Sequence, residues 1–404
     1  MKKATGYIAA RDMLLDIVKA VDTEKVPLEK SYGRILAEDL TAKVNVPEFD
    51  RSPLDGYSLR AEDTACASKE NPITFKITEE IPCGFMPTKK VTEGTAAKIL
   101  TGAPIPEGAD CVIMFEKTEF TADEVKIFAP IKKGDNIIYA GEDVKAGTVL
   151  AEKGTVIDAG LAGTLAAQGV MYPAVYVQPT VGIISTGSEL AGEDEEIKPG
   201  KIRNTNRYML TAALEKINCS ADYVGTGKDA AEEIADLIQI GLTFSDAIVL
   251  TGGVSVGDYD LTPKAMEMAG VEILVRGVAL KPGMACALGH KDGKLVCGLS
   301  GNPASSMTTY YAVVQPCLKK LAGFDEYVPK MFDVILQNDF PKASGGTRMI
   351  RGHLVLEDDK VKIVNSQEQG NVVISSMIKS DAMAVVPAGT GPLKAGTVLK
   401  GFQI

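Results

Sequence analysis

Hydrophobic and polar positions follow different patterns in successive parts of the chain. Apolar residues lie three and four apart over residues 8–21, which predicts an amphipathic helix near the start. From about residue 40 to residue 150, short β-like runs are separated by turns that contain Pro and Gly, so this section should be all-β or nearly so. A short helix is predicted over 158–168, with Asp158 as its N-cap and Gly169 just past its end.

Strands and helices alternate between residues 177 and 323. The apolar runs that we expect to be buried strands are 181–185, 246–252 and 295–299. The expected helices lie near 206–217, 229–241, 261–269 and 303–322. Because connecting helices pack on the faces of the strands they join, this alternation predicts a mostly parallel sheet with helices on both faces. Past residue 328 the β pattern returns, which indicates a separate C-terminal β domain.

Composition limits the possible classes of function. The chain has 404 residues, of which 45% are hydrophobic, and this length suggests roughly two to four domains. Lys and Arg number 43 against 53 Asp and Glu, so the net charge of −10 argues against a nucleic-acid partner. No apolar run approaches the roughly 18 residues of a membrane span, and no signal-peptide core follows the first residues. We therefore expect a cytoplasmic protein without a membrane partner.

Cysteine and histidine usage fits this location. The seven cysteines show no CxxC spacing, and several lie in apolar runs, so we expect reduced thiols. Only two histidines are present, His290 and His353, which argues against a zinc site with histidine ligands.

Three of the expected strands run into loops that contain glycine. These loops are 185–189, 251–258 and 298–306. Ligands of open α/β sheets bind beyond the carboxyl ends of the strands, and glycine lets the backbone approach a ligand closely. Helix N-termini at such loops suit a phosphate or another oxyanion without any Lys or Arg. Gly-rich turns can also serve only as connections, but three of them in one sheet favour a ligand site.

Carboxylates surround these loops. Glu189, Asp258 and Asp260 follow strand ends directly, and Asp229 opens a helix. An anionic ligand would be repelled by them, so an oxygen-ligated Mg²⁺ that bridges to the ligand is the natural resolution. Structural roles are the alternative: Asp229 with Glu232 fits a capping box, and Asp258 and Asp260 fit loop or cap positions.

Other ligand classes have weaker support. Residues 225–230 match the dinucleotide-binding pattern GxGxxA, but the preceding strand is weak and the pattern lies in the middle of its domain. The chain has no GxxxxGK(S/T) motif, which excludes a Walker-type NTPase. Both histidines lie outside the three loops, so no Ser/His/Asp hydrolase set can be assembled convincingly.

Several segments resemble the motifs of one family. They are RSPLDGY at 51–57, LTGAPIPEGAD at 100–110, GED at 141–143, STGSEL at 185–190, RNTNR at 203–207 and the glycine-rich run at 252–260. In content and order they are similar to those of the molybdopterin molybdenumtransferase family, which includes MoeA and the E domain of gephyrin. The resemblance covers nearly the whole chain.

The resemblance, together with the patterns above, implies a multidomain fold of the α/β plus β class. Its expected parts are an N-terminal helix with an elongated linker domain (1–45 and 142–176), an inserted β-rich domain (46–141), a central three-layer α/β domain with a mostly parallel sheet that binds molybdopterin (177–327) and a C-terminal β-barrel-like domain (328–404).

The resemblance also implies an enzymatic role in molybdenum cofactor biosynthesis. Molybdate would be inserted into adenylylated molybdopterin, and AMP would be released with Mg²⁺ as cofactor. A homodimer with a shared active site is implied, with molybdopterin adenylyltransferase as the donor of the substrate. Two alternatives stay open at this point: a diverged paralogue that inserts tungstate, and a non-catalytic scaffold on the same fold.

Motif matching assigns residues to the implied site. The catalytic residues are Asp55, Thr101 and Asp143 from one subunit and Glu189, Asp229, Asp260 and Lys281 from the other. Glu189, Asp229 and Asp260 are also the implied Mg²⁺ ligands. The residues expected to bind the pterin or its phosphate are Thr186, Gly187, Gly252, Gly253, Ser255, Gly257, Gly301, Asn302, Pro303 and Ser305.

Three positions depart from the family pattern. Ser300 replaces the first proline of P-G-N-P, Met284 replaces the second lysine of K-P-G-K-P, and Ile138 lies where an arginine is common. Two cations are thus missing near an oxyanion site. We therefore expect weak oxyanion binding that depends on Lys281 and on the backbone N–H groups of residues 301–302.

Overall fold

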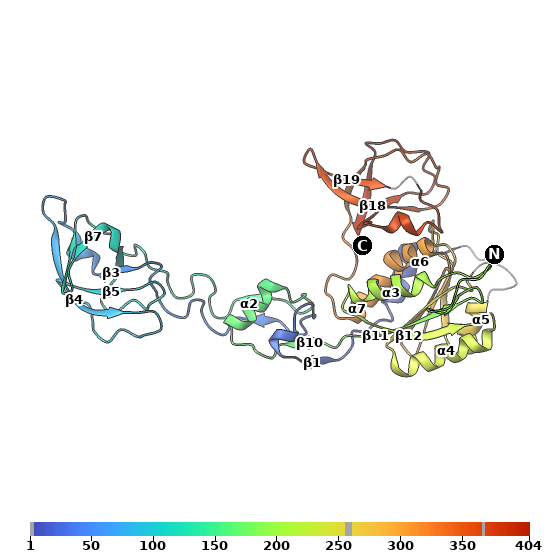
Figure 1. Ribbon diagram of the computed structural model, residues 1–404, viewed down its shortest axis with the longest axis horizontal. Coiled ribbons are helices and arrows are strands. Elements are labelled where there is room, and N and C mark those ends of the chain that lie inside the picture. Colours follow the sequence, from blue (N-terminus) through green and yellow to red (C-terminus); the bar gives the residue numbers. More distant parts are fainter. Residues whose placement is uncertain (1–3, 255–260, 366–367) are drawn as a thin grey trace. The chain divides into compact units, whose positions relative to one another are not determined.

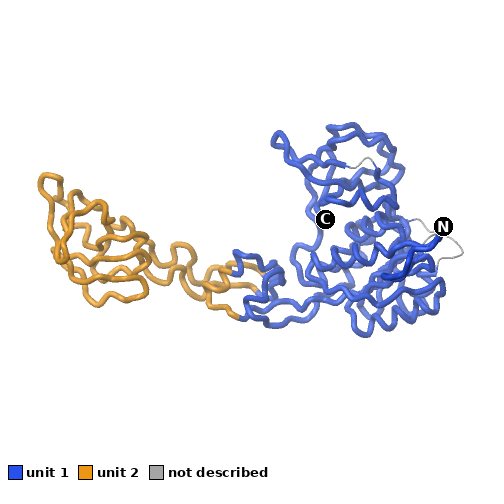
Figure 2. The backbone as a smooth tube through the Cα atoms, viewed as in Figure 1, with its two compact units in different colours: residues 1–38, 153–162, 172–404 blue, residues 39–152, 163–171 orange. Residues whose placement is uncertain are grey.

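The computed structural model describes residues 4–254, 261–365 and 368–404. Figure 2 shows the two compact units that the chain forms. The first comprises residues 1–38, 153–162 and 172–404, and the second comprises residues 39–152 and 163–171. The chain therefore passes from the first unit to the second and back twice before residues 172–404 complete the first.

The second unit is built on a six-stranded β-sheet. Its strands are β3 (Gly56–Leu59), β4 (Ile73–Ile81), β5 (Thr95–Ile99), β6 (Cys111–Met114), β7 (Thr118–Phe120) and β8 (Glu124–Ile127). Their order is β6-β3-β5-β4-β8-β7, with β4 and β5 parallel and the other neighbours antiparallel. A smaller ribbon pairs β2 (Leu40–Thr41) with β9 (Val149–Ala151). The predicted β-rich section is confirmed.

A second six-stranded sheet forms the centre of the first unit. Its strands are β11 (Thr180–Thr186), β12 (Ser220–Gly227), β13 (Ala247–Thr251), β14 (Glu272–Arg276), β15 (Cys286–Lys291) and β16 (Lys294–Leu299). The order is β12-β11-β13-β16-β15-β14. The first four strands in this order are parallel, and β15 and β14 add an antiparallel edge. The predicted, mostly parallel sheet is confirmed.

Helices cover both faces of this sheet, so the domain has three layers (Figure 1). One face carries α4 (Ala231–Phe244) and α5 (Leu261–Met268), and the other carries α3 (Thr205–Glu215) and α6 (Pro303–Thr309). Successive residues of β13 face the two layers: Val249 packs in the same core cluster as α3, and Leu250 packs in the cluster of α4 and α5. Because both faces are buried, these strands read as continuous apolar runs in the sequence.

The last helix of the α/β domain changes its winding along its length. The predicted helix over 303–322 is observed as α6, a π turn over Tyr310–Val314, and α7 (Gln315–Leu321). Pro316 has no N–H and cannot donate a hydrogen bond to the preceding turn. The helix changes its winding next to this position, where one backbone hydrogen bond is already absent.

The two helices predicted outside the α/β section have different outcomes. α1 covers Tyr7–Leu15, so the helix predicted over 8–21 is too long. Beyond it the backbone pairs with a distant segment, and Val21 N–H donates to Leu321 O at 2.9 Å. The prediction of α2 (Ala159–Ala167) is confirmed, because the Asp158 carboxylate accepts a hydrogen bond from Leu161 N–H at 2.8 Å.

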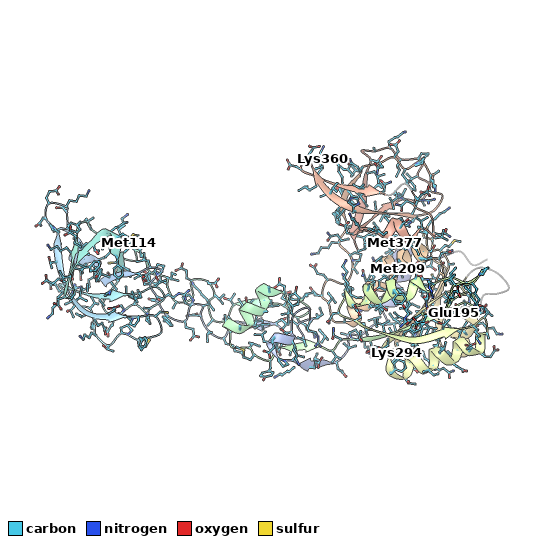
Figure 3. The ribbon with its side chains drawn as sticks, in the orientation of Figure 1. Met114, Glu195, Met209, Lys294, Lys360 and Met377 are labelled. Carbon is cyan, nitrogen blue, oxygen red and sulfur yellow. The ribbon has the colours of Figure 1, made fainter. Side chains whose placement is uncertain are left out.

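The C-terminal segment forms a closed five-stranded barrel, as predicted. Its strands are β17 (Phe332–Leu336), β18 (Arg348–Glu357), β19 (Lys360–Asn365), β20 (Ala382–Val386) and β21 (Val398–Gln403). The barrel shares a hydrophobic cluster with the α/β domain. Met377, on the short 3₁₀ helix Ile374–Met377, and Met209 of α3 both pack against that cluster (Figure 3).

Burial of the cysteines fits their expected chemistry. Five of the seven are buried and all seven are free, while Cys66 and Cys83 are exposed. Burial raises the pKa of the Cys286 and Cys317 thiols to about 12, so these core thiols stay protonated at neutral pH. Across the described residues, no helix has both the length and the apolar character needed to cross a membrane.

Candidate functional site

The three glycine-containing loops lie at one edge of the α/β sheet. β11 ends at Thr186, β13 ends at Thr251 and β16 ends at Leu299, and these neighbouring strands are parallel, so their carboxyl ends lie side by side. A cavity of about 650 Å³ opens at this edge. Its lining includes the predicted ligand-binding residues Thr186, Gly187, Gly252, Gly253, Gly301, Asn302 and Pro303.

Glycine is required in the loop after β13. Gly252 has φ +104°, and a Cβ there would lie 2.4 Å from the hydroxyl of Thr186. Gly253 has φ +62°, and its Cβ would lie 2.6 Å from Thr262 Oγ1. That hydroxyl donates to Gly252 O at 2.8 Å, which fixes the loop against the start of α5. The two glycines therefore bring bare backbone to the wall of the cavity.

The loop after β16 is held in place by hydrogen bonds with two side chains of the α/β domain. Asn206 of α3 donates from Nδ2 to Gly301 O at 2.9 Å, and Asn302 N–H donates to Ser300 Oγ at 3.2 Å. Pro303 occupies the first turn of α6, where its missing N–H leaves no hydrogen bond unmade. The cavity is thus bordered by a helix start, as predicted from the Gly-Asn-Pro sequence.

Two of the predicted carboxylates, Asp229 and Glu189, line the same cavity. The Asp229 carboxylate accepts hydrogen bonds from Ser188 Oγ and from Ser188 N–H. It does not cap α4, whose N-cap residue is Ala230, so the capping-box alternative is wrong. The Glu189 side chain turns back over its own loop. Its carboxylate lies so close to Gly187 that a Cβ at that residue would be 2.4 Å from Glu189 Oε2.

This donor set suits a hard divalent cation. Mg²⁺ is commonly held by one or two protein carboxylates together with phosphate oxygens of the substrate, and Glu189 with Asp229 supplies such a pair. Within residues 4–254, 261–365 and 368–404, no group of three or more His, Cys, Asp or Glu side chains is placed to hold a metal ion. Asp260, the third predicted ligand, lies outside the described residues, as do Asp258, Ser255 and Gly257.

A second cavity, of about 640 Å³, adjoins the first and contains Lys281 and Ser305. Ala285, Ser300 and Asn302 line both cavities. Lys281 is fixed by backbone pairing with the start of β18, since its N–H donates to Thr347 O at 2.9 Å. Met284, where the resemblance led us to expect a lysine, also lines this cavity.

Sequence reasoning missed two cations of the second cavity. Lys342 and Arg348 lie in the C-terminal domain and line the same cavity as Lys281. The described lining of this cavity contains these three cations and no carboxylate. No spacing in the sequence links Lys342 and Arg348 to Lys281, because the barrel is brought to the α/β domain only by tertiary packing.

The GxGxxA segment serves packing. Gly225 and Gly227 lie on β12, at the edge of the sheet. A Cβ on Gly227 would lie 2.9 Å from the Ile234 side chain, and one on Gly225 would lie 3.2 Å from Leu237. These glycines therefore allow α4 to approach the strand closely.

The other predicted catalytic residues, Asp55, Thr101 and Asp143, lie in the second unit. Thr101 donates to the same Asp55 oxygen from its N–H and from its hydroxyl, both at 2.7 Å. These two bonds lower the pKa of Asp55, the hydroxyl bond being the larger cause. Asp143 is exposed and its N–H donates to Val46 O at 3.0 Å. Ile138, where the resemblance led us to expect an arginine, pairs with Arg51 through backbone hydrogen bonds.

The fold and the cavity together define a class. A three-layer α/β domain with a glycine-lined cavity at its strand ends, joined to a β-rich domain and a small barrel, is a multidomain ligand-binding α/β protein. Residues 6–169 match the MoeA N-terminal region (domain I and II), residues 182–320 match the "probable molybdopterin binding domain", and residues 333–400 match the MoeA C-terminal region (domain IV). The chain belongs to the MoeA family of molybdopterin molybdenumtransferases, enzymes of molybdenum cofactor biosynthesis.

Individual relatives extend over almost the whole chain. A molybdopterin molybdenumtransferase of Staphylococcus aureus is 37% identical over 371 residues, which are 92% of this chain and 88% of that protein. One from Staphylococcus epidermidis is 35% identical over 395 residues, 97% of this chain and 94% of that protein. The crystal structure of a molybdopterin biosynthesis MoeA protein from Pyrococcus horikoshii OT3 matches with a TM-score of 0.85 and 33% identity, covering 100% of both chains.

Proposed function

We propose that this protein inserts molybdate into adenylylated molybdopterin and releases AMP in a Mg²⁺-dependent reaction. The observation that carries the proposal is the pair of adjoining cavities in the first unit. One is lined by three glycine loops and two carboxylates, and the other is lined by three cations. A substrate with phosphates and a separate oxyanion substrate match these two linings.

The pterin substrate is assigned to the first cavity. The backbone at Gly252 and Gly253 approaches the cavity without side chains, and α6 begins at its border. Glycine backbone without side chains and a helix start favour the close approach of phosphate oxygens. Mg²⁺ bound by Glu189 and Asp229 would offset the negative charge of the phosphates and polarise the bond to AMP.

The oxyanion is assigned to the second cavity. Lys281, Lys342 and Arg348 give it a positive field, and Ser305 supplies a hydroxyl. The cavity therefore contains more cations than the sequence indicated, even with Met284 in place of a lysine. Because the two cavities share a wall, an oxyanion held here would lie next to the pterin substrate.

The proposal includes a homodimer with a shared active site, supplied with substrate by molybdopterin adenylyltransferase. The supporting observation is that the lining residues of both cavities belong to the first unit, while the Asp55–Thr101 pair, which motif matching assigns to the same site, belongs to the second. In the dimer, the second unit of one subunit would contribute Asp55, Thr101 and Asp143 to the cavity of the other.

Anaerobic reconstitution tests the proposed reaction. Purified protein, adenylylated molybdopterin and molybdate should release AMP and form molybdenum cofactor only when Mg²⁺ is present, and a parallel series with tungstate measures metal selectivity. Glu189→Gln should require more Mg²⁺ for half-maximal AMP release, because one charge that holds the cation is lost. Glu232→Gln, in the first turn of α4, is the matched control and should behave as wild type. AMP release without Mg²⁺, or a Glu189→Gln enzyme with unchanged Mg²⁺ dependence, would contradict the proposal.

A further inference from the structure

Ser300 occupies the wall that the two cavities share. Its side chain is 8% exposed, and the residue lines both the glycine-loop cavity and the cationic cavity. The family resemblance led us to expect a proline here, which has no hydroxyl, whereas this chain places a polar group at the shared wall.

The hydroxyl of Ser300 has an unused proton. Its oxygen accepts a hydrogen bond from Asn302 N–H at 3.2 Å. In the part of the chain that the structure describes, no group accepts a hydrogen bond from this hydroxyl. Buried hydroxyl groups are normally used as donors as well as acceptors. The Ser300 hydroxyl belongs to a residue that lines two cavities, so a ligand bound there can accept a hydrogen bond from it.

The chemistry of the cationic cavity identifies that ligand. A fully deprotonated tetrahedral oxyanion has only acceptors, and the cavity offers it Lys281, Lys342 and Arg348 as donors. Met284 supplies no donor where the family has a lysine. We propose that the Ser300 hydroxyl donates a hydrogen bond to the oxyanion substrate at the shared wall, on the side that faces the pterin cavity. This inference rests on the proposed function, because it takes the second cavity as the oxyanion site.

Calorimetric titration of sodium molybdate into the full-length protein tests the inference without turnover. Ser300→Ala should weaken molybdate binding by about tenfold or more, the size expected for a lost charge-assisted hydrogen bond. Ser300→Thr retains the hydroxyl and should bind nearly as wild type. Ser306→Ala is the matched control. Ser306 lies on α6, which follows the Ser300 loop; it is fully buried, lines neither cavity and has a hydroxyl without a partner among the described residues, so its removal should leave binding unchanged.

A purely structural role for Ser300 predicts a different result. If the hydroxyl only held Asn302, then Ser300→Ala would loosen the loop and weaken adenylylated molybdopterin as much as molybdate, because Asn302 lines both cavities. The inference predicts a loss for molybdate that clearly exceeds any loss for the pterin. Equal losses for the two ligands, or no loss for molybdate, would overturn it.

Lys281→Ala separates the inference from the function on which it rests. A large loss of molybdate binding in Lys281→Ala with none in Ser300→Ala would retain the oxyanion cavity and reject the role of Ser300. Unchanged binding in both variants would reject the cavity as the oxyanion site, and with it both proposals.

Discussion

At the scale of single residues, Asp55 shows how one neighbour can set the charge of a carboxylate. Thr101 donates to it from both its hydroxyl and its N–H, and these bonds lower its pKa below the ordinary 3.8. Because the pKa of Asp55 is lower in the folded state than in the unfolded state, these hydrogen bonds contribute their full stabilisation of the fold when the pH is above the pKa of the unfolded state. The stabilisation is lost as the pH falls through the lowered pKa. Asp55 is therefore fully ionised throughout the neutral range.

Removing the hydroxyl of Thr101 should raise the pKa of Asp55. In Thr101→Val the N–H bond remains and the larger of the two causes disappears, so the pKa should move upward toward 3.8 without reaching it. Titration of the carboxyl ¹³C resonance measures this shift. Asp339, whose pKa is lowered by Lys394, is the internal reference and should not move. An unchanged Asp55 titration would show that the hydroxyl does not stabilise the ionised form.

At the scale of elements, α3 begins at the ligand cavity, and its cap belongs to the site. Asn204 is the N-cap residue: its side-chain oxygen accepts from Arg207 N–H at 3.2 Å, while its Nδ2 donates to Ser185 Oγ at 2.8 Å. The residue also lines the glycine-loop cavity. One side chain thus joins the end of β11 to the start of α3.

Asn204→Ala should therefore affect both stability and ligand binding. Loss of a helix cap costs about 1 kcal/mol, so the unfolding midpoint of the α/β domain should fall by a few degrees. Differential scanning calorimetry measures the midpoint. Asp158→Ala removes the comparable cap of α2 and should lower stability without changing affinity for adenylylated molybdopterin. If Asn204→Ala kept wild-type stability and wild-type affinity for adenylylated molybdopterin, then Asn204 would neither stabilise the start of α3 nor contribute to ligand binding.

The sequence predicted elements well where their signal was local. The buried strands β11, β13 and β16 follow from apolar runs, because a strand covered on both faces has no polar positions to alternate with. The β15–β16 hairpin also had a local signal that the sequence analysis did not use. Asp292 and Gly293 both have positive φ between the two strands, as the common two-residue Asp-Gly turn requires.

Predictions failed where tertiary contacts decide the outcome. Apolar periodicity extended the first helix to residue 21, but the chain leaves α1 after Leu15 to pair with Leu321. Asp229 had the spacing of a capping residue, but its carboxylate binds Ser188 instead. The glycine-loop half of the site was predictable, because parallel strands end at one edge. The cationic half was not, because Lys342 and Arg348 reach Lys281 only when the barrel packs on the α/β domain.

At the scale of the whole molecule, the proposed active site requires residues from both units. If the site is shared between subunits, then Asp55→Asn changes the part of each site that one subunit supplies, and Glu189→Gln changes the part that the other subunit supplies. Mixed dimers would contain one site with both substitutions and one site with neither. The assay uses a Mg²⁺ concentration too low to support Glu189→Gln. Co-expression of the two impaired variants, with different affinity tags to isolate the mixed dimer, should then restore close to half of the wild-type AMP release. A mixed dimer as impaired as its parents under these conditions would show that Asp55 and Glu189 act within one chain.

The central claim is that the three glycine loops of the α/β domain bind the adenylylated pterin. Calorimetric titration of adenylylated molybdopterin into wild type, Gly253→Val and Gly396→Val tests it most directly. Gly253→Val places a branched side chain against Thr262 and into the cavity, whereas Gly396 has a similarly positive φ but no atom within 4 Å of its Cβ position. The account predicts that affinity falls by at least about tenfold in Gly253→Val and is retained in Gly396→Val. Equal affinity in all three folded proteins would contradict the account and place the pterin elsewhere.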